Sequence, residues 1–139
     1  MVDWKPPKFG SPCWMGIAAT DVGRAHKFYS TVFNWTFKPQ PADHPESKIR
    51  LFDFNPDVSL SGGLLLVPEE TGALKTGKGG TCVHWFVEDI DKTSEAIIAA
   101  GGNMISDKLP EGKSGLYRYF EDTEGNIGSV YQFCPEGNQ

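Results

Sequence analysis

Two stretches of the chain carry apolar residues at the three- and four-residue spacing of an amphipathic helix. The first follows Thr20 or Asp21, and either side chain can cap the free N–H groups of a first turn. Its apolar stripe consists of Val22, Ala25, Phe28, Tyr29, Val32 and Phe33. The second follows Asp89, and its stripe consists of Ile90, Thr93, Ala96, Ile97 and Ala100. We therefore predict helices over 22–33 and 90–100, each with one face toward a core.

Shorter apolar or alternating runs predict strands before and after each helix. In the first half these runs cover 13–18, 35–38, 49–54 and 61–67. In the second half they cover 81–87, 103–109, 116–121 and 127–133. Each half therefore has the order strand, helix and three strands.

The two halves align on each other with a constant offset. Asp21 falls on Asp89, and Val22 falls on Ile90. An internal repeat of this kind indicates duplicated supersecondary units. We therefore expect an α+β fold of two tandem βαβββ modules, whose eight strands form one curled mixed sheet around a concave cup.

The length of 139 residues fits a single domain with a real core. We predict one domain over 1–139, with module one at about 11–67 and module two at about 81–134. The segment between them, 68–80, is rich in Gly, Lys and Glu and is expected to be a linker. Its stretch GALKTGKG approaches a phosphate-binding loop, but it lacks the closing Ser or Thr and the helix that such a loop requires.

Composition excludes several classes of partner. The net charge of -5 and the pI near 5.1 argue against nucleic acid, which binds to basic patches. No apolar run approaches the roughly 20 residues that span a bilayer, and the start MVDWKPPKFG lacks the apolar core of a secretory signal. We therefore expect a cytoplasmic protein with no membrane partner. Its three cysteines, an odd number without CxxC spacing, are expected to be reduced thiols.

Three segments resemble the vicinal-oxygen-chelate superfamily of glyoxalases, bleomycin-resistance proteins and extradiol dioxygenases. They are CWMGIAATDVGRAHKFYSTVFNWTF, its counterpart VHWFVEDIDKTSEAIIAAGGNMI, and the closing turn and strand YFEDTEGNIGSVYQF. The resemblance implies the paired βαβββ modules and a homodimer. It also implies a concave face where the first and last strands of each module supply His, Gln or Glu ligands to a divalent metal, which polarises substrate oxygens.

The positions that the resemblance assigns to those ligands hold other residues here. They are Trp14, Cys82, Ser129 and a Gly or Leu within 62–66. A metal site needs three or four good ligands, and Trp, Gly and Leu supply none. We therefore expect no metal at the usual site and no other cofactor.

Side chains alternate along a strand, so the residues expected on the concave face can be named. We expect a site with His84 as the candidate catalytic residue and with Trp14, Cys82, Phe86, Ser129 and Tyr131 as substrate-binding residues. His84, among apolar neighbours, is able to shuttle a proton or to bond a ligand oxygen; the alternative is a hydrogen-bonded structural histidine. Trp14 either stacks on a planar ligand or fills the metal position.

The acidic turn before the last predicted strand has two interpretations. Glu121, Asp122 and Glu124 are expected to build the turn together with Gly125 and Asn126. The alternative is a paired-carboxylate site for acid–base chemistry.

Three hypotheses for function follow from these features. The leading one is metal-independent binding of a small, partly apolar or aromatic molecule in the cup. The second is an enzyme of the lyase, isomerase or dioxygenase type, which uses His84 as acid and base or in an unusual metal site. The third is an interaction module whose exposed sheet edges form dimers; edges of this kind, with the resemblance, also lead us to expect a homodimer.

Overall fold

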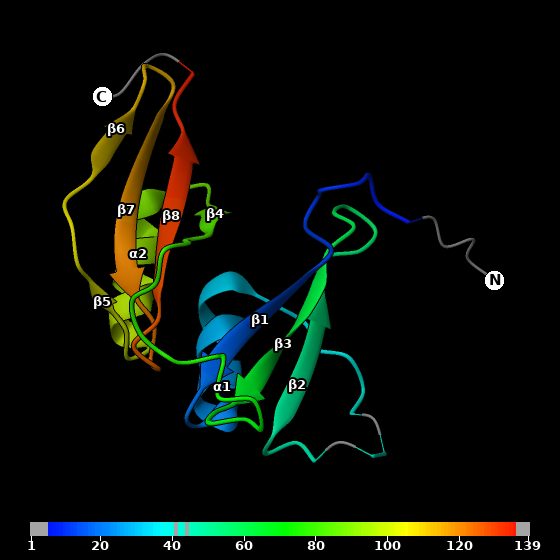
Figure 1. The fold of residues 1–139 in the computed structure, drawn as a ribbon. Helices are drawn as coiled ribbons and strands as arrows, with labels where there is room; N and C mark the ends of the chain where they lie inside the picture. Colours follow the sequence, from blue (N-terminus) through cyan, green and yellow to red (C-terminus); the bar gives the residue numbers. More distant parts are fainter. Residues whose placement is uncertain (1–5, 41, 44, 136–139) are drawn as a thin grey trace.

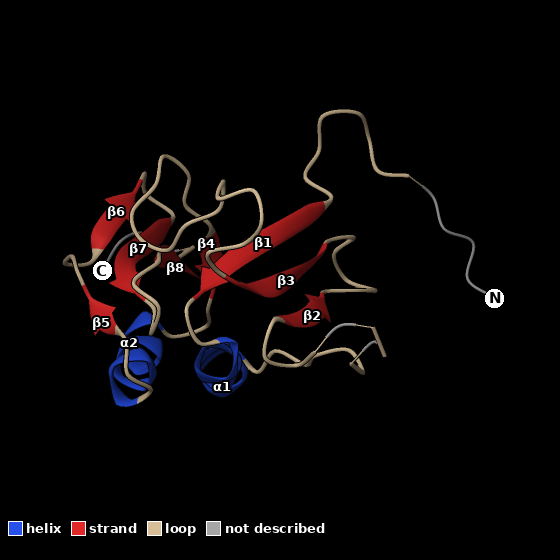
Figure 2. Cartoon of the chain, turned by 60° about the horizontal axis from the view of Figure 1, so that its bottom comes forward, coloured by secondary structure: helices blue, strands red, loops and turns tan. Residues whose placement is uncertain are grey.

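A computed structural model describes residues 6–40, 42–43 and 45–135. These residues form a mixed α+β fold with two helices and two sheets (Figure 1). Helices α1 (Val22–Phe33) and α2 (Ile90–Ala99) pack beside each other on one side of the sheets (Figure 2). In the part of the chain that the structure covers, no helix has the length and apolar character needed to span a membrane.

The first half of the chain forms a three-stranded sheet in the order β1-β3-β2. Strand β1 (Trp14–Ala19) runs parallel to β3 (Ser61–Leu66), and β2 (Ile49–Asp53) runs antiparallel to β3. Gly16 pairs with Gly63 in the centre of the parallel pair.

The second half forms a five-stranded sheet in the order β4-β8-β7-β5, with β6 also paired to β7. Its elements are β4 (His84–Phe86), β5 (Asn103–Met104), β6 (Leu109–Glu111), β7 (Gly115–Glu121) and β8 (Ile127–Phe133). As in the first sheet, the first and last strands are parallel neighbours, and the remaining pairs are antiparallel.

The expectation of one curled sheet of eight strands is wrong for the described residues, because eight strands are present in two separate sheets. The predicted strand 35–38 contributes only a bridge between Phe37 and Phe52, since the next residue, Pro39, has no N–H to continue a ladder. The predicted strand 103–109 splits into β5 and β6. The hydroxyl of Ser106 accepts the N–H of Tyr119 at 3.0 Å, so a side chain replaces the backbone carbonyl there.

Both predicted helices are confirmed, with the second ending one residue early. Asp21 caps α1 by accepting the N–H of Arg24 at 3.0 Å, and Asp89 caps α2 in the same way with two N–H groups. Asn34 ends α1 in the left-handed conformation, with φ of 57°.

The core lies between the two helices and the sheets. Its largest fully buried side chains are Phe28, Phe52, Phe120, Leu64, Ile90, Ile97, Val22 and Val130. Trp85 of the second sheet contacts the rings of Phe33, Trp35 and Phe54 from the first half, with centroids 5.0 to 6.0 Å apart. This aromatic cluster and the two helices join the halves of the chain.

Candidate functional site

The parallel pair β4–β8 brings four of the predicted site residues together. His84 pairs with Ser129, and Phe86 pairs with Tyr131, so all four side chains share one face of the second sheet. We call this surface the tyrosine face, because β7 adds two further tyrosines to it. Its members are His84, Phe86, Tyr117, Tyr119, Ser129 and Tyr131.

Sequence reasoning missed Tyr117 and Tyr119. Tyr119 pairs with Ser129 and Tyr117 with Tyr131 across the antiparallel hairpin. Their alternation along β7 shows that the two tyrosines share a face. Alternation alone does not show which face of the sheet the two tyrosines occupy. Their face depends on the register of β7 against β8, which the turn between these strands fixes.

His84 is exposed to solvent on this face. Its ring centroid is 5.5 Å from that of Tyr117 and 6.1 Å from that of Tyr119. The expectation of apolar, enclosing neighbours is wrong, because the residue is exposed and its ring neighbours are tyrosines. No described residue forms a hydrogen bond with the imidazole, so both ring nitrogens are available to a ligand.

The other three predicted members of the tyrosine face differ in what they offer. The Phe86 ring is 69% exposed. Tyr131 covers Gly115 and donates its phenol hydrogen to Glu111 Oε1 at 3.2 Å. Ser129 is fully buried and donates weakly, at 3.4 Å, to the carbonyl oxygen of Val130. Contact with a ligand therefore falls mainly to the rings and to His84.

The structure does not bring Trp14 and Cys82 to this face. Trp14 lies on β1 of the other sheet, where its indole covers Gly16 and Gly63 and remains 46% exposed. Cys82 precedes β4, and its thiol donates to the carbonyl oxygen of Val83 at 3.5 Å. Burial raises the pKa of the Cys82 thiol, which disfavours the reactive thiolate.

The donors on the tyrosine face do not fit the divalent metal that the resemblance implies. They are one imidazole, one buried serine hydroxyl and phenols, whereas a metal centre uses three or four imidazole, carboxylate or thiolate ligands. Nowhere in residues 6–40, 42–43 and 45–135 do three or more His, Cys, Asp or Glu side chains gather in a way that would hold a metal ion.

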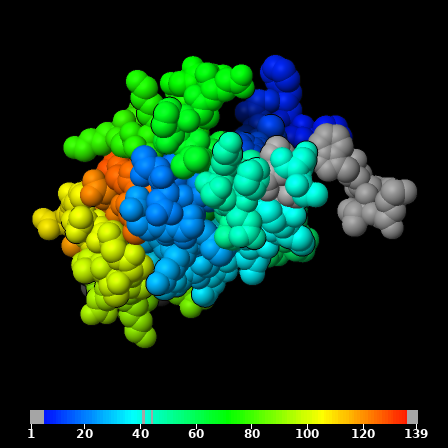
Figure 3. Space-filling view, turned by 90° about the horizontal axis from the view of Figure 1, so that it is seen from below, coloured from blue at the N-terminus to red at the C-terminus, as the bar shows by residue number. Residues whose placement is uncertain are grey.

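The acidic turn has a structural use. Glu124 has a side chain with no exposed surface, and its Oε1 accepts the N–H groups of Thr20 and Asp21 at 2.9 and 3.0 Å. Its Oε2 accepts the Nε–H of Arg24 at 2.6 Å. The turn thus lies against the start of α1 (Figure 3). The carboxylate of Glu124 is engaged in these hydrogen bonds, so it does not serve as one of a pair of carboxylates for acid–base chemistry.

The ionisation of the two buried carboxyls follows from their partners. Burial acts to raise the pKa of Glu124, but the hydrogen bonds from Arg24 and from the backbone of Asp21 outweigh it and hold the pKa at about 2. For Asp122, burial prevails and raises the pKa, although the carboxyl accepts the Tyr29 hydroxyl at 2.7 Å. Burial, followed by the nearby charge of Asp122 and this hydrogen bond, raises the pKa of Tyr29 well above its ordinary value.

Comparison with known proteins identifies the family to which this chain belongs. Residues 14–131 match the family described as Glyoxalase-like domain. A glyoxylase-like domain-containing protein of Didymella fabae is 35% identical over 116 residues, which cover 82% of this chain and 87% of that protein.

Solved structures show the same fold at lower identity. A glyoxalase-related enzyme from Fulvimarina pelagi superposes with a TM-score of 0.71 at 19% identity, over 89% of this chain and 88% of that one. The fosfomycin resistance protein FosX from Listeria monocytogenes superposes with a TM-score of 0.64 at 16% identity, over 88% and 90% of the two chains. By sequence match, the chain belongs to the glyoxalase-like domain family, and the solved structures share its fold.

Proposed function

We propose that this protein binds a small, partly apolar or aromatic molecule on the tyrosine face without a divalent metal. One observation carries the proposal: His84 lies exposed between aromatic rings that share a single face of the second sheet. Aromatic rings stack on flat or apolar ligands, and a few polar groups among them fix the orientation. His84 supplies such a group, since a neutral imidazole offers one donor and one acceptor.

An enzyme of the lyase, isomerase or dioxygenase type is the second candidate. The observation that favours it is that His84 is exposed and has both ring nitrogens available among the described residues. A histidine in that state is able to take a proton from a bound molecule and return it. A bound compound that is converted by the wild-type protein, and not by a His84→Gln variant, would establish this candidate over simple binding.

The proposal includes an architecture. One domain over 1–139 contains module one at about 11–67, the linker 68–80 and module two at about 81–134. The parallel pairing of first and last strands in each sheet supports two βαβββ modules. We place the protein in the cytoplasm as a homodimer, with the small molecule as its ligand and with neither nucleic acid nor membrane as a partner.

Replacing His84 with phenylalanine is expected to leave stability almost unchanged, within about 0.5 kcal/mol, because the side chain is exposed and unbonded. Ligand affinity is expected to fall, since both nitrogens are lost while the ring remains. Thermal unfolding and titration of the best compound from a thermal-shift screen measure the two effects. A large drop in melting temperature would instead assign His84 a structural role.

Metal content is expected to be below one divalent ion per chain in protein purified without chelator. The reason is the donor set, which lacks the three or four good ligands that a tight site requires. Elemental analysis of the dialysed protein measures this ratio. One tightly held ion per chain, retained through dialysis, would contradict metal-independent binding.

The protein is expected to have twice the chain mass of 15.3 kDa in solution. The observation behind this expectation is that Trp14 and Val58 are each about half exposed, outside the tyrosine face, and a second copy would cover such side chains. Light scattering coupled to size exclusion measures the mass directly. A monomer mass at high protein concentration would rule the dimer out.

A further inference from the structure

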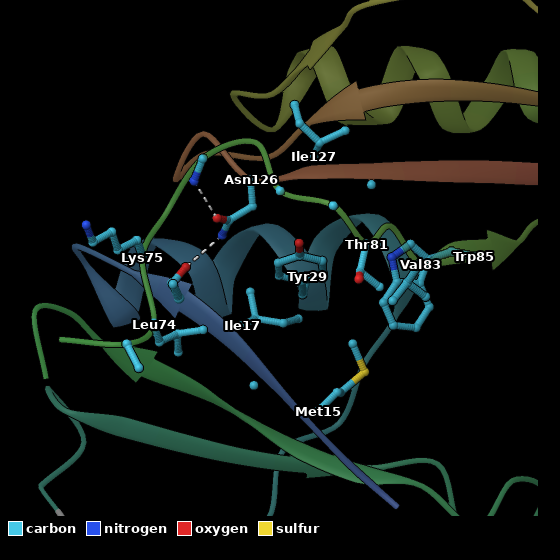
Figure 4. A pocket seen from close by; sticks show the side chains of 17 residues that line it. Met15, Ile17, Tyr29, Leu74, Lys75, Thr81, Val83, Trp85, Asn126 and Ile127 are labelled. Carbon is cyan, nitrogen blue, oxygen red and sulfur yellow. Dashed lines mark hydrogen bonds between the residues drawn. The ribbon is translucent and has the colours of Figure 1, made fainter. Parts of the chain in front are cut away.

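A cavity of about 690 Å³ lies between the two sheets, bounded by β1, by β4 and the start of β8, and by residues 73–81, which include the end of the linker (Figure 4). Its volume falls within the range of roughly 300–1,000 Å³ typical of small-molecule sites. On β4 it lies on the opposite side from the tyrosine face, because Val83 and Trp85 line it and alternate with His84 and Phe86. On β8 its lining begins at Ile127, two residues before Ser129.

The larger side chains that line the cavity are mostly apolar, and glycine backbone forms part of the wall. The apolar side chains come from both sheets and from the linker, and they are Met15, Ile17, Leu74, Val83, Trp85 and Ile127. An apolar ring or branched chain placed there would lose water from most of its surface.

The side chain of Asn126 holds the linker next to β1 through two hydrogen bonds at the border of the cavity. Its Oδ1 accepts the N–H of Gly77 at 3.0 Å, and its Nδ2 donates to the carbonyl oxygen of Ala18 at 2.7 Å (Figure 4). One side chain thus holds three segments at this border: β1, the linker and the turn before β8. The border is therefore fixed by specific bonds rather than by chance contact of two sheets.

The polar groups of the lining differ in availability. The hydroxyl of Tyr29 is engaged, since it donates to Asp122 Oδ2 at 2.7 Å. Thr81 projects from just after the linker into the cavity, and its hydroxyl forms no hydrogen bond with a described residue (Figure 4). Lys75 is the only charged residue of the lining and lies at the rim, without an ion-pair partner among the residues described.

We propose that this cavity is a second binding site, for a small carboxylate with an apolar ring or branched chain. The apolar part lies between Met15, Ile17 and Trp85, and the carboxylate lies at the rim with Lys75. The flexible stem of the lysine lets its amine reach an anion at the opening. This site is independent of the tyrosine face and of the ligand proposed there.

The probe that tests this proposal is 1-naphthaleneacetate, with the uncharged 1-naphthaleneacetamide as its matched control. Methyl spectra of the 139-residue protein report where the ring binds. We expect ring-current shifts at Met15, Ile17 and Ile127, and none at Ile98, which is exposed on α2. We expect the acetate to bind about fivefold more tightly than the acetamide. This is the gain in affinity expected from a partly exposed ion pair between the carboxylate and Lys75.

Two lysine variants and one filling variant complete the test. Lys75→Gln is expected to remove the preference for the acetate, whereas Lys78→Gln, in the same linker but outside the lining, is expected to keep it. Thr81→Phe fills the cavity from just after the linker and is expected to abolish binding of both probes. Unmoved methyl groups at millimolar probe, or equal binding of acetate and acetamide, would each overturn the proposal. Shifts confined to the ring signals of Tyr117 and Tyr119 in aromatic spectra would overturn it as well.

Discussion

Replacing Glu124 with alanine is expected to destabilise the protein by about 3 kcal/mol. The substitution leaves the N–H groups of Thr20 and Asp21 without their acceptor at the start of α1. Arg24 contributes less to the loss, because its side chain is 49% exposed and water replaces the carboxylate there. Urea unfolding followed by circular dichroism measures the change, with Glu88→Ala as the control for loss of an exposed carboxylate.

The same variant isolates a pH effect with a definite sign. The pKa of Glu124 is lowered from 4.5 to about 2, so its stabilisation is fully present above pH 4.5 and is lost as the pH falls toward 2. Asp122 acts in the opposite direction, because burial raises its pKa and its ionised form weakens the fold. The difference between wild type and Glu124→Ala should therefore be constant near neutral pH and shrink below 4.5. A difference that persists unchanged to pH 2 would contradict this role of the carboxylate.

Replacing Gly62 with alanine is expected to destabilise the protein by about 2 kcal/mol. A Cβ at this position on β3 would meet the carbonyl oxygen of Met15 on the paired strand and the Phe52 ring, whose Cζ is 2.8 Å away. The backbone oxygen cannot move without disturbing the parallel pair, so the strain remains in the first sheet. Denaturant midpoints of wild type and variant measure the loss.

The linker provides a matched control for that substitution. Gly79 has no atom within 4 Å of an added Cβ and does not adopt the left-handed conformation. Gly79→Ala is therefore expected to leave the midpoint within about 0.5 kcal/mol of wild type. Equal midpoints for the two alanine variants would show that β3 tolerates the extra methyl group.

The helices could be predicted from local sequence signals. The strands were predicted less well, because their ends depend on contacts between residues far apart in the sequence. The caps Asp21 and Asp89, followed by apolar stripes, are properties of single segments. The split of the strand at 103–109 depends on Ser106 meeting Tyr119, a residue 13 positions away. The sequence pattern of either segment does not predict the hydrogen bond between Ser106 and Tyr119.

The candidate site shows the same division. Alternation along β4 and β8 placed His84 with Phe86, and Ser129 with Tyr131, on faces that the parallel register then joins. Trp14 was expected beside them, but its position depends on how the edges of the two sheets meet, and they form separate sheets. Tyr117 and Tyr119 could not be assigned because their face depends on the register across a turn.

The most direct measurement of the central claim is a titration in chelator-treated protein. The ligand is the strongest compound from a thermal-shift screen of small aromatic molecules, because a ligand of the native state raises apparent stability. The titration compares wild type with Tyr119→Leu on the tyrosine face and with Ile98→Ser, an exposed position on α2. We predict binding to wild type and Ile98→Ser in the presence of chelator, and affinity at least about tenfold weaker in Tyr119→Leu. Binding that requires an added divalent ion, or that is equal in all three proteins, would contradict metal-independent binding on the tyrosine face.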